Sequence, residues 1–138
     1  MFSRLQICAV AILTGVFLAA SYSPVFAMEP ATCAAIEGID TNNDGTVDLN
    51  EAKQAATATF DRLDKNKDGT LSPKELQGRF SKRQLGAADT NHEGTLSKDE
   101  YLAAVEARFK AADVNGDGTV SCREAHSVAG HALLRLLK

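Results

Sequence analysis

Several features that define common protein classes are scarce in this 138-residue sequence. Its longest apolar run, residues 7–20, is shorter than the roughly 20 residues that a membrane-spanning helix needs. Lysine and arginine number 15 against 18 acidic residues, so the basic surplus of a nucleic-acid-binding protein is missing. The three cysteines lack the CxxC and Cys/His spacings of zinc and redox centres. These absences argue against a membrane protein, a nucleic-acid-binding protein and a zinc protein.

The first 27 residues have the pattern of a secretory signal peptide. Arg4 gives a basic start, the apolar run follows, and residues 25–27 (VFA) offer the small side chains of a cleavage site. We expect this segment to be removed, which leaves residues 28–138 as a single periplasmic or secreted domain. A retained membrane anchor is the alternative.

Two cysteines remain after that cleavage, Cys33 and Cys122. An exported protein meets an oxidising environment, so a disulfide between them is one interpretation. Two free, buried thiols are the other, and the sequence does not decide between them.

Four 12-residue segments repeat along the chain, starting 24, 25 and 24 residues apart. Each begins with aspartate and has glycine at position 6, threonine at position 7, an apolar residue at position 8 and glutamate at position 12. Their net charges are −4, 0, −3 and −2 in chain order. Such residues also form turns and helix caps, but turn and cap formation alone does not explain four copies in register.

The repeated pattern is that of the EF-hand calcium loop, whose ligands occupy positions 1, 3, 5, 7, 9 and 12. A hard cation prefers six to eight oxygen ligands, and the glycine permits the sharp turn that gathers them. The predicted ligands of the first two loops are Asp40, Asn42, Asp44, Thr46, Asp48 and Glu51, then Asp64, Asn66, Asp68, Thr70, Ser72 and Glu75. Those of the last two are Asp89, Asn91, Glu93, Thr95, Ser97 and Glu100, then Asp113, Asn115, Asp117, Thr119, Ser121 and Glu124.

The gaps between the loops, residues 52–63, 76–88 and 101–112, hold only 12 or 13 residues and show helical spacing of apolar residues. We therefore predict an all-α, compact EF-hand domain of four calcium-type loops joined by single shared helices, with a bend near Gly78 and Gly86. Straight helices would pair the first loop with the third and the second with the fourth. Strong kinking would pair the first with the fourth and the second with the third. The apolar residue at position 8 should join paired loops by a short β-bridge.

The chain resembles the lanmodulin-like family of secreted bacterial proteins with four closely spaced EF-hands. The resemblance includes FDRLDKNKDGTLSPKEL, GTLSKDEYLAAVEARFKAAD and the tail SVAGHALLRLLK. It implies a helical domain that binds several trivalent rare-earth ions and becomes more ordered on binding. Unlike that family, this chain has no proline at position 2, has asparagine at every position 3 and serine at three of the four positions 9. Fewer carboxylates suit a divalent ion better, so calcium is the predicted ion and a lanthanide the alternative.

We expect a monomeric buffer or carrier of metal ions, without enzymatic activity and with folding coupled to metal. The first loop should bind most tightly and the third, with Glu93 at position 5, most weakly. His126 and His131, expected on one helix, have a spacing that does not align two ligands. A calcium sensor with a protein partner is an alternative, although Met28 would be its only methionine after cleavage. A dockerin-like adhesion module is a third class, but dockerins carry two loops.

Overall fold

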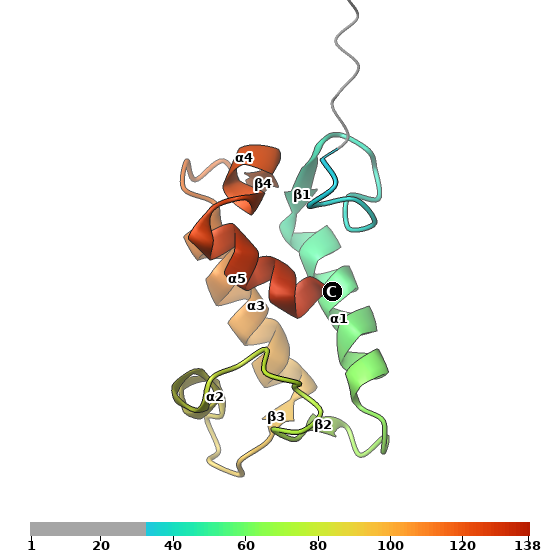
Figure 1. Ribbon diagram of the computed structural model, residues 1–138, viewed down its shortest axis with the longest axis vertical. Coiled ribbons are helices and arrows are strands. Elements are labelled where there is room, and N and C mark those ends of the chain that lie inside the picture. The colour runs from blue at the N-terminus through green and yellow to red at the C-terminus, as the bar shows by residue number, and fades with distance from the viewer. Residues whose placement is uncertain (1–32) are drawn as a thin grey trace, which may run out of the picture.

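Two long helices, α1 (Leu49–Leu63) and α3 (Lys98–Ala112), run between the two ends of the fold in opposite chain directions, as Figure 1 shows for the computed structural model. The structure describes residues 33–138. Both helices begin with a capping box, in which the residue before the helix and the glutamate at its third position bond each other's backbone N–H. The predicted signal peptide and Met28 lie outside the described residues.

Short strands join the loops in two antiparallel pairs. β1 (Thr46–Asp48) pairs with β4 (Thr119–Ser121), and β2 (Thr70–Leu71) pairs with β3 (Leu96–Ser97). The position-8 residues lie opposite each other and are buried, as predicted, in the pairs Val47 with Val120 and Leu71 with Leu96. The domain is therefore helix-rich with two small strand pairs, and the all-α class is not confirmed.

The second connection is the main correction to the predicted fold. Residues 73–80 form turns, and the only helix there is the short α2 (Lys82–Ala88). Gln77 and Gly78 have φ values of +49° and +76°, which a right-handed helix cannot contain. Because α2 spans only about 10 Å at 1.5 Å per residue, the chain stays at the same end of the molecule. The second loop therefore pairs with the third and the first with the fourth, so the pairing expected from straight helices was wrong.

The C-terminal helix α5 (Val128–Leu137) completes the core by packing on both α1 and α3 (Figure 1). The Tyr101 hydroxyl donates to the Leu136 carbonyl at 2.7 Å, and the Thr59 hydroxyl donates to the Leu137 carbonyl at 3.0 Å. These bonds satisfy carbonyls at the end of α5 that have no partner within the helix. The apolar faces predicted for the first and third connections are mostly buried, at Ala52, Ala56, Phe60, Leu63, Val105, Phe109 and Ala112.

A disulfide joins Cys33 to Cys122, which settles the alternative left open by the sequence. Their Cα atoms lie 5.7 Å apart although the residues are 89 positions apart in the chain. Cys122 opens the short helix α4 (Cys122–Ala125), directly after β4. Among residues 33–138, no helix is long and apolar enough to cross a membrane.

Candidate metal centre

The four predicted loops lie at opposite ends of the two long helices (Figure 1). Loop 1 (residues 40–51) and loop 4 (113–124) form one end, here called the 1/4 end. Loop 2 (64–75) and loop 3 (89–100) form the other, the 2/3 end. Helix α1 connects loop 1 to loop 2, and α3 connects loop 3 to loop 4.

Each loop is folded around the aspartate at its first position. One carboxylate oxygen accepts a hydrogen bond from the glycine N–H at position 6, with N···O distances of 2.8–3.0 Å. The other oxygen accepts from the N–H at position 5, at 3.1–3.3 Å. The aspartates and glycines are Asp40 with Gly45, Asp64 with Gly69, Asp89 with Gly94 and Asp113 with Gly118. The first predicted ligand is thus turned into its loop in every copy.

The glutamate at position 12 lies across the opening of three of the loops. In loops 1, 3 and 4 its Oε1 accepts from the backbone N–H at position 2, at 2.8–3.0 Å. In all four loops its Oε2 accepts from the N–H at position 9, at 2.9–3.0 Å. Glu51 and Glu124, at the 1/4 end, are only 6% and 8% exposed. In loop 2 the closest contacts of Glu75 are with the N–H and hydroxyl of Ser72.

Positions 3, 5 and 7 form a second set of contacts inside each loop. The asparagine amide at position 3 donates to the carboxylate at position 5, at 2.6–3.1 Å. In loops 1, 2 and 4 the position-7 threonine donates to that carboxylate from both its backbone N–H and its hydroxyl, at 2.7–2.9 Å. Among the described residues of loop 3, Thr95 makes neither bond to Glu93. The longer glutamate therefore leaves loop 3 without a contact that its three neighbours share.

Hydrogen bonds lower the pKa of several of the loop carboxylates. The Thr90 hydroxyl, followed by the Ser97 N–H, lowers the pKa of Glu100 to about 2. Desolvation raises the pKa of Glu51, but hydrogen bonds from three backbone N–H groups and the Thr41 hydroxyl outweigh it and the net shift is downward. The pKa values of Asp44, Asp68, Glu75, Asp117 and Glu124 are also lowered, in each case by hydrogen bonds from threonine or serine in the same loop. Anionic oxygens are the form that a cation requires.

Position 4 is a backbone feature that reasoning from ligands alone had missed. Its residue has positive φ in every loop: Asn43 at +58°, Lys67 at +58°, His92 at +57° and Gly116 at +71°. Asparagine and glycine tolerate this left-handed conformation, whereas lysine and histidine do so at a cost of about 1 kcal/mol or more. The asparagine in loop 1 and the glycine in loop 4 were the signal in the sequence that could have revealed it.

The donor set of each loop fits a hard cation. The side chains at positions 1, 3, 5, 9 and 12 all offer oxygen, and they form two hydrogen-bonded sets in each loop, one around positions 1, 3 and 5 and the other around positions 9 and 12. No thiol or imidazole takes part in these contacts within the described loops. The ligand positions predicted from the repeat stay a prediction. The sixth predicted ligand, threonine at position 7, begins the strand in loops 1, 2 and 4.

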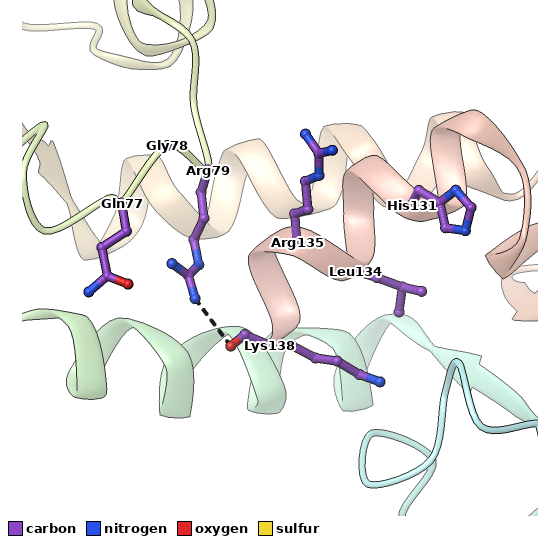
Figure 2. Close-up of a pocket in the computed structure, with 7 residues that line it drawn as sticks. All are labelled: Gln77, Gly78, Arg79, His131, Leu134, Arg135 and Lys138. Carbon is purple, nitrogen blue, oxygen red and sulfur yellow. Dashed lines mark hydrogen bonds between the residues drawn. The ribbon is translucent and has the colours of Figure 1, made fainter.

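One large hollow lies away from the loops and has the wrong charge for a cation. It has a volume of about 710 Å³ and lies between the turn at Gly78 and helix α5 (Figure 2). Arg79, Arg135 and Lys138 are among its lining residues, and Arg79 donates to the Lys138 carbonyl at 3.2 Å. None of the predicted ligands lines it.

The two histidines near the chain end also required a correction. His126 is the C-cap of α4 and His131 lies in α5, which begins after Ser127, so they do not share a helix. The turn between these helices brings the two rings into an edge-on contact, with centroids 6.3 Å apart. Their separation of five positions in the sequence was therefore no guide to their spacing in the fold.

Comparison with known families agrees with this geometry. Residues 35–54, 57–81 and 105–124 match the model of the EF hand. The chain carries EF-hand motifs. The matched segments contain loops 1, 2 and 4, and such motifs imply calcium-type metal binding. Loop 3 lies outside the matches, and it is also the loop in which Glu93 replaces the shorter aspartate. No curated protein matches the chain significantly.

Proposed function

We propose that this protein binds Ca²⁺ through all four loops, as a buffer or carrier outside the cytoplasm. The observation that carries the proposal is the repeated arrangement of inward-turned carboxylates in each loop. Loop 3 is included because its aspartate and its position-12 glutamate make the same contacts as in the other loops. Export to the periplasm or beyond is supported by the Cys33–Cys122 disulfide, which persists in oxidising compartments.

The loops should differ in affinity between the two ends. Loops 1 and 4 together carry a net charge of −6, and loops 2 and 3 carry −3. Loop 1 has four carboxylates among its side-chain ligand positions, and the other loops have three each. Because affinity in EF-hands rises with ligand charge and rigidity, the 1/4 end should fill first. Lys65, Lys67 and Lys74 are exposed, so they lower the affinity of loop 2 only modestly in salt.

A buffer or carrier fits the fold better than a calcium sensor. A sensor needs a groove that opens between its helices to receive a partner. Here α1 and α3 contact each other directly and α5 packs against both, with Leu133, Leu136 and Leu137 almost fully buried. The large apolar side chains exposed among the described residues are Val114 and Val128, which form no such groove.

Calcium should also hold the fold together. Each long helix has a loop at both of its ends, and each loop pairs through a sheet of only two or three residue pairs. Without ions the clustered carboxylates repel one another at both ends, and a domain of this size has little stability to spare. We expect chelator to remove much of the far-ultraviolet circular dichroism of the helices and calcium to restore it.

Calorimetric titration of the purified protein with calcium, and separately with lanthanum, tests the proposal. Glu124→Gln removes one charged ligand at the 1/4 end, and Glu100→Gln removes one at the 2/3 end. Each variant should abolish or weaken calcium binding at its own end and leave binding at the other end. Gln84, the third residue of α2, supplies the matched control, because Gln84→Glu adds a carboxylate outside the loops and should leave affinity unchanged. A preference for lanthanum beyond that expected from ionic charge would favour the lanmodulin-type alternative. Absence of heat with either ion would refute metal binding.

A further inference from the structure

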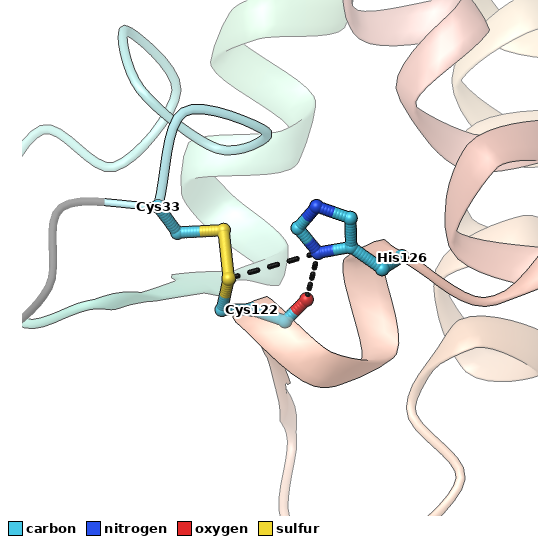
Figure 3. A group of neighbouring side chains, drawn as sticks. All are labelled: Cys33, Cys122 and His126. Carbon is cyan, nitrogen blue, oxygen red and sulfur yellow. Dashed lines mark hydrogen bonds between the residues drawn. A yellow bond between two sulfur atoms is a disulfide. The ribbon is translucent and has the colours of Figure 1, made fainter.

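The fold brings together three side chains that no calcium loop uses as ligands. Cys33 precedes loop 1, Cys122 opens α4 and His126 caps the end of that helix (Figure 3). Their ligand atoms, two Sγ and one imidazole nitrogen, all lie within 4.8 Å of one another. Cys122 Sγ lies 3.7 Å from His126 Nδ1. The two cysteines are 89 positions apart in the chain, so it is the fold that brings them together.

We propose that Cys33, Cys122 and His126 form a second metal site, which takes Zn²⁺ when the disulfide is reduced. Zinc accepts thiolate sulfur at about 2.3 Å and imidazole nitrogen at about 2.0 Å. Ligand atoms around a tetrahedral ion at those distances lie roughly 3.5–4 Å apart. The observed separation between Cys122 Sγ and His126 Nδ1 is of this size. To admit the ion, the two sulfurs must separate and the His126 ring must turn its Nδ1 away from the Cys122 carbonyl oxygen, 2.7 Å away.

The disulfide and the zinc ion exclude each other, because both use the same two sulfur atoms. A dithiol reductant supplies two electrons and two protons, the Cys33–Cys122 bond breaks, and the reductant forms its own disulfide. The two thiols then release their protons to water as Zn²⁺ binds, so the two thiolates balance the charge of the ion. The site is therefore available only to the reduced protein.

His126 supplies nitrogen from the surface side of the cluster. It is exposed, whereas Cys33 is buried and Cys122 is half-buried. Its Nδ1 lies 2.7 Å from the Cys122 carbonyl oxygen, which can only accept a hydrogen bond, so Nδ1 carries the proton in this structure. Ligation by Nδ1 moves that proton to Nε2, where water can accept its hydrogen bond. The exposed side leaves room for a water as the fourth ligand.

Zinc at this position would take over the structural role of the disulfide. In either form the link fastens the chain before loop 1 to α4, the helix in which loop 4 ends. The inference is independent of calcium binding. Thiolate ligands favour zinc, whereas the all-oxygen loops favour calcium, so excess calcium occupies the loops without competing for the sulfurs.

Native mass spectrometry of the full chain in excess calcium, with Zn²⁺ as the probe, tests the site. The protein reduced with a phosphine should bind one more zinc ion than the oxidised protein. Cys33→Ser should lose that ion, and His126→Ala should bind it at least about tenfold more weakly. His131→Ala is the matched control and should keep it. Replacement of zinc by Co²⁺ should add a thiolate-to-metal charge-transfer band in the reduced protein alone.

Equal zinc counts in the reduced and oxidised proteins would overturn the proposal, and so would equal affinity in His126→Ala and the wild type. Circular dichroism of each sample shows whether the protein unfolds when it is reduced. Zinc should then restore helicity to the wild type but not to Cys33→Ser, and a failure to bind or to refold would count against the site. Because the comparison is between redox states, its outcome does not depend on whether the loops bind calcium.

Discussion

The two ends of the molecule are built from the same repeat but differ in how firmly they are held. At the 1/4 end the strands have three residues, both position-12 glutamates are buried, and a disulfide fastens the chain before loop 1 to α4. At the 2/3 end the strands have two residues, the position-12 glutamates are more exposed, and turns and a short helix connect the loops. The stability of each copy of the motif therefore depends on the residues packed around it. We expect the 1/4 end to resist unfolding more than the 2/3 end.

Removal of the disulfide should have the largest effect and should erase the advantage of the 1/4 end. Opening a covalent loop closed across 89 positions costs about 4.6 kcal/mol in the free energy of unfolding. The double variant Cys33→Ser with Cys122→Ser should therefore unfold at much lower urea concentration in the presence of calcium. Unchanged urea stability would show that the tether contributes nothing to this end.

Two glycine-to-alanine substitutions, one near each end, compare how tightly the backbone is packed at the two ends. A Cβ on Gly130 would lie 2.1 Å from the Glu124 carbonyl oxygen, so Gly130→Ala must push α5 away from α4 at a cost of about 3 kcal/mol. Gly86 in α2 has open space around it, so Gly86→Ala should stabilise the protein by up to about 1 kcal/mol. Thermal unfolding of both variants measures the difference. The same sign of effect for both would contradict the packing described here.

Shortening one side chain should strengthen the weaker end. Glu93→Asp would let the position-5 carboxylate of loop 3 accept the two bonds from Thr95 that the other loops have. Two such bonds in an exposed loop are worth about 1 kcal/mol, or roughly a fivefold gain in calcium affinity. The reverse change Asp44→Glu in loop 1 should produce a loss of similar size. Titration calorimetry would reject this explanation of loop 3 if Glu93→Asp binds no better than the wild type.

The smallest expected effect concerns position 4 of loop 2. Lys67 has a φ of +58°, which asparagine tolerates better, as at Asn43 in loop 1. Lys67→Asn should stabilise the protein by about 0.5 kcal/mol and raise calcium affinity slightly by removing a positive charge. Lys65→Asn changes the same charge without the backbone effect. If the two variants have equal urea stability, backbone strain at position 4 is not a factor.

The sequence predicted the parts of the fold that depend on local spacing. The apolar series Ala52, Ala56, Phe60 and Leu63 has a helical period, and all four side chains are buried in α1. The β-bridges at position 8 follow from the register of the repeat, and the structure confirms them. The loop contacts likewise follow from residue type and position.

The second connection could not be predicted from apolar spacing, because Leu76 and Phe80 keep a helical period while the backbone between them turns. Gly78 signals the break, and Ser81 with Gln84 forms the capping box that starts a new helix. The proximity of Cys33 to Cys122 depends on that break, since only the pairing of loop 1 with loop 4 brings the two residues to one end. The contact between Cys33 and Cys122 thus depends on the local turn at Gly78.

The most direct test of the account is to count calcium ions on the intact, oxidised protein by native mass spectrometry while helicity is followed in parallel. Four ions are predicted, with an early pair from the 1/4 end, a later pair from the 2/3 end, and a rise in helicity as they bind. A protein that holds no calcium at any concentration, and has the same helicity in chelator, would contradict it.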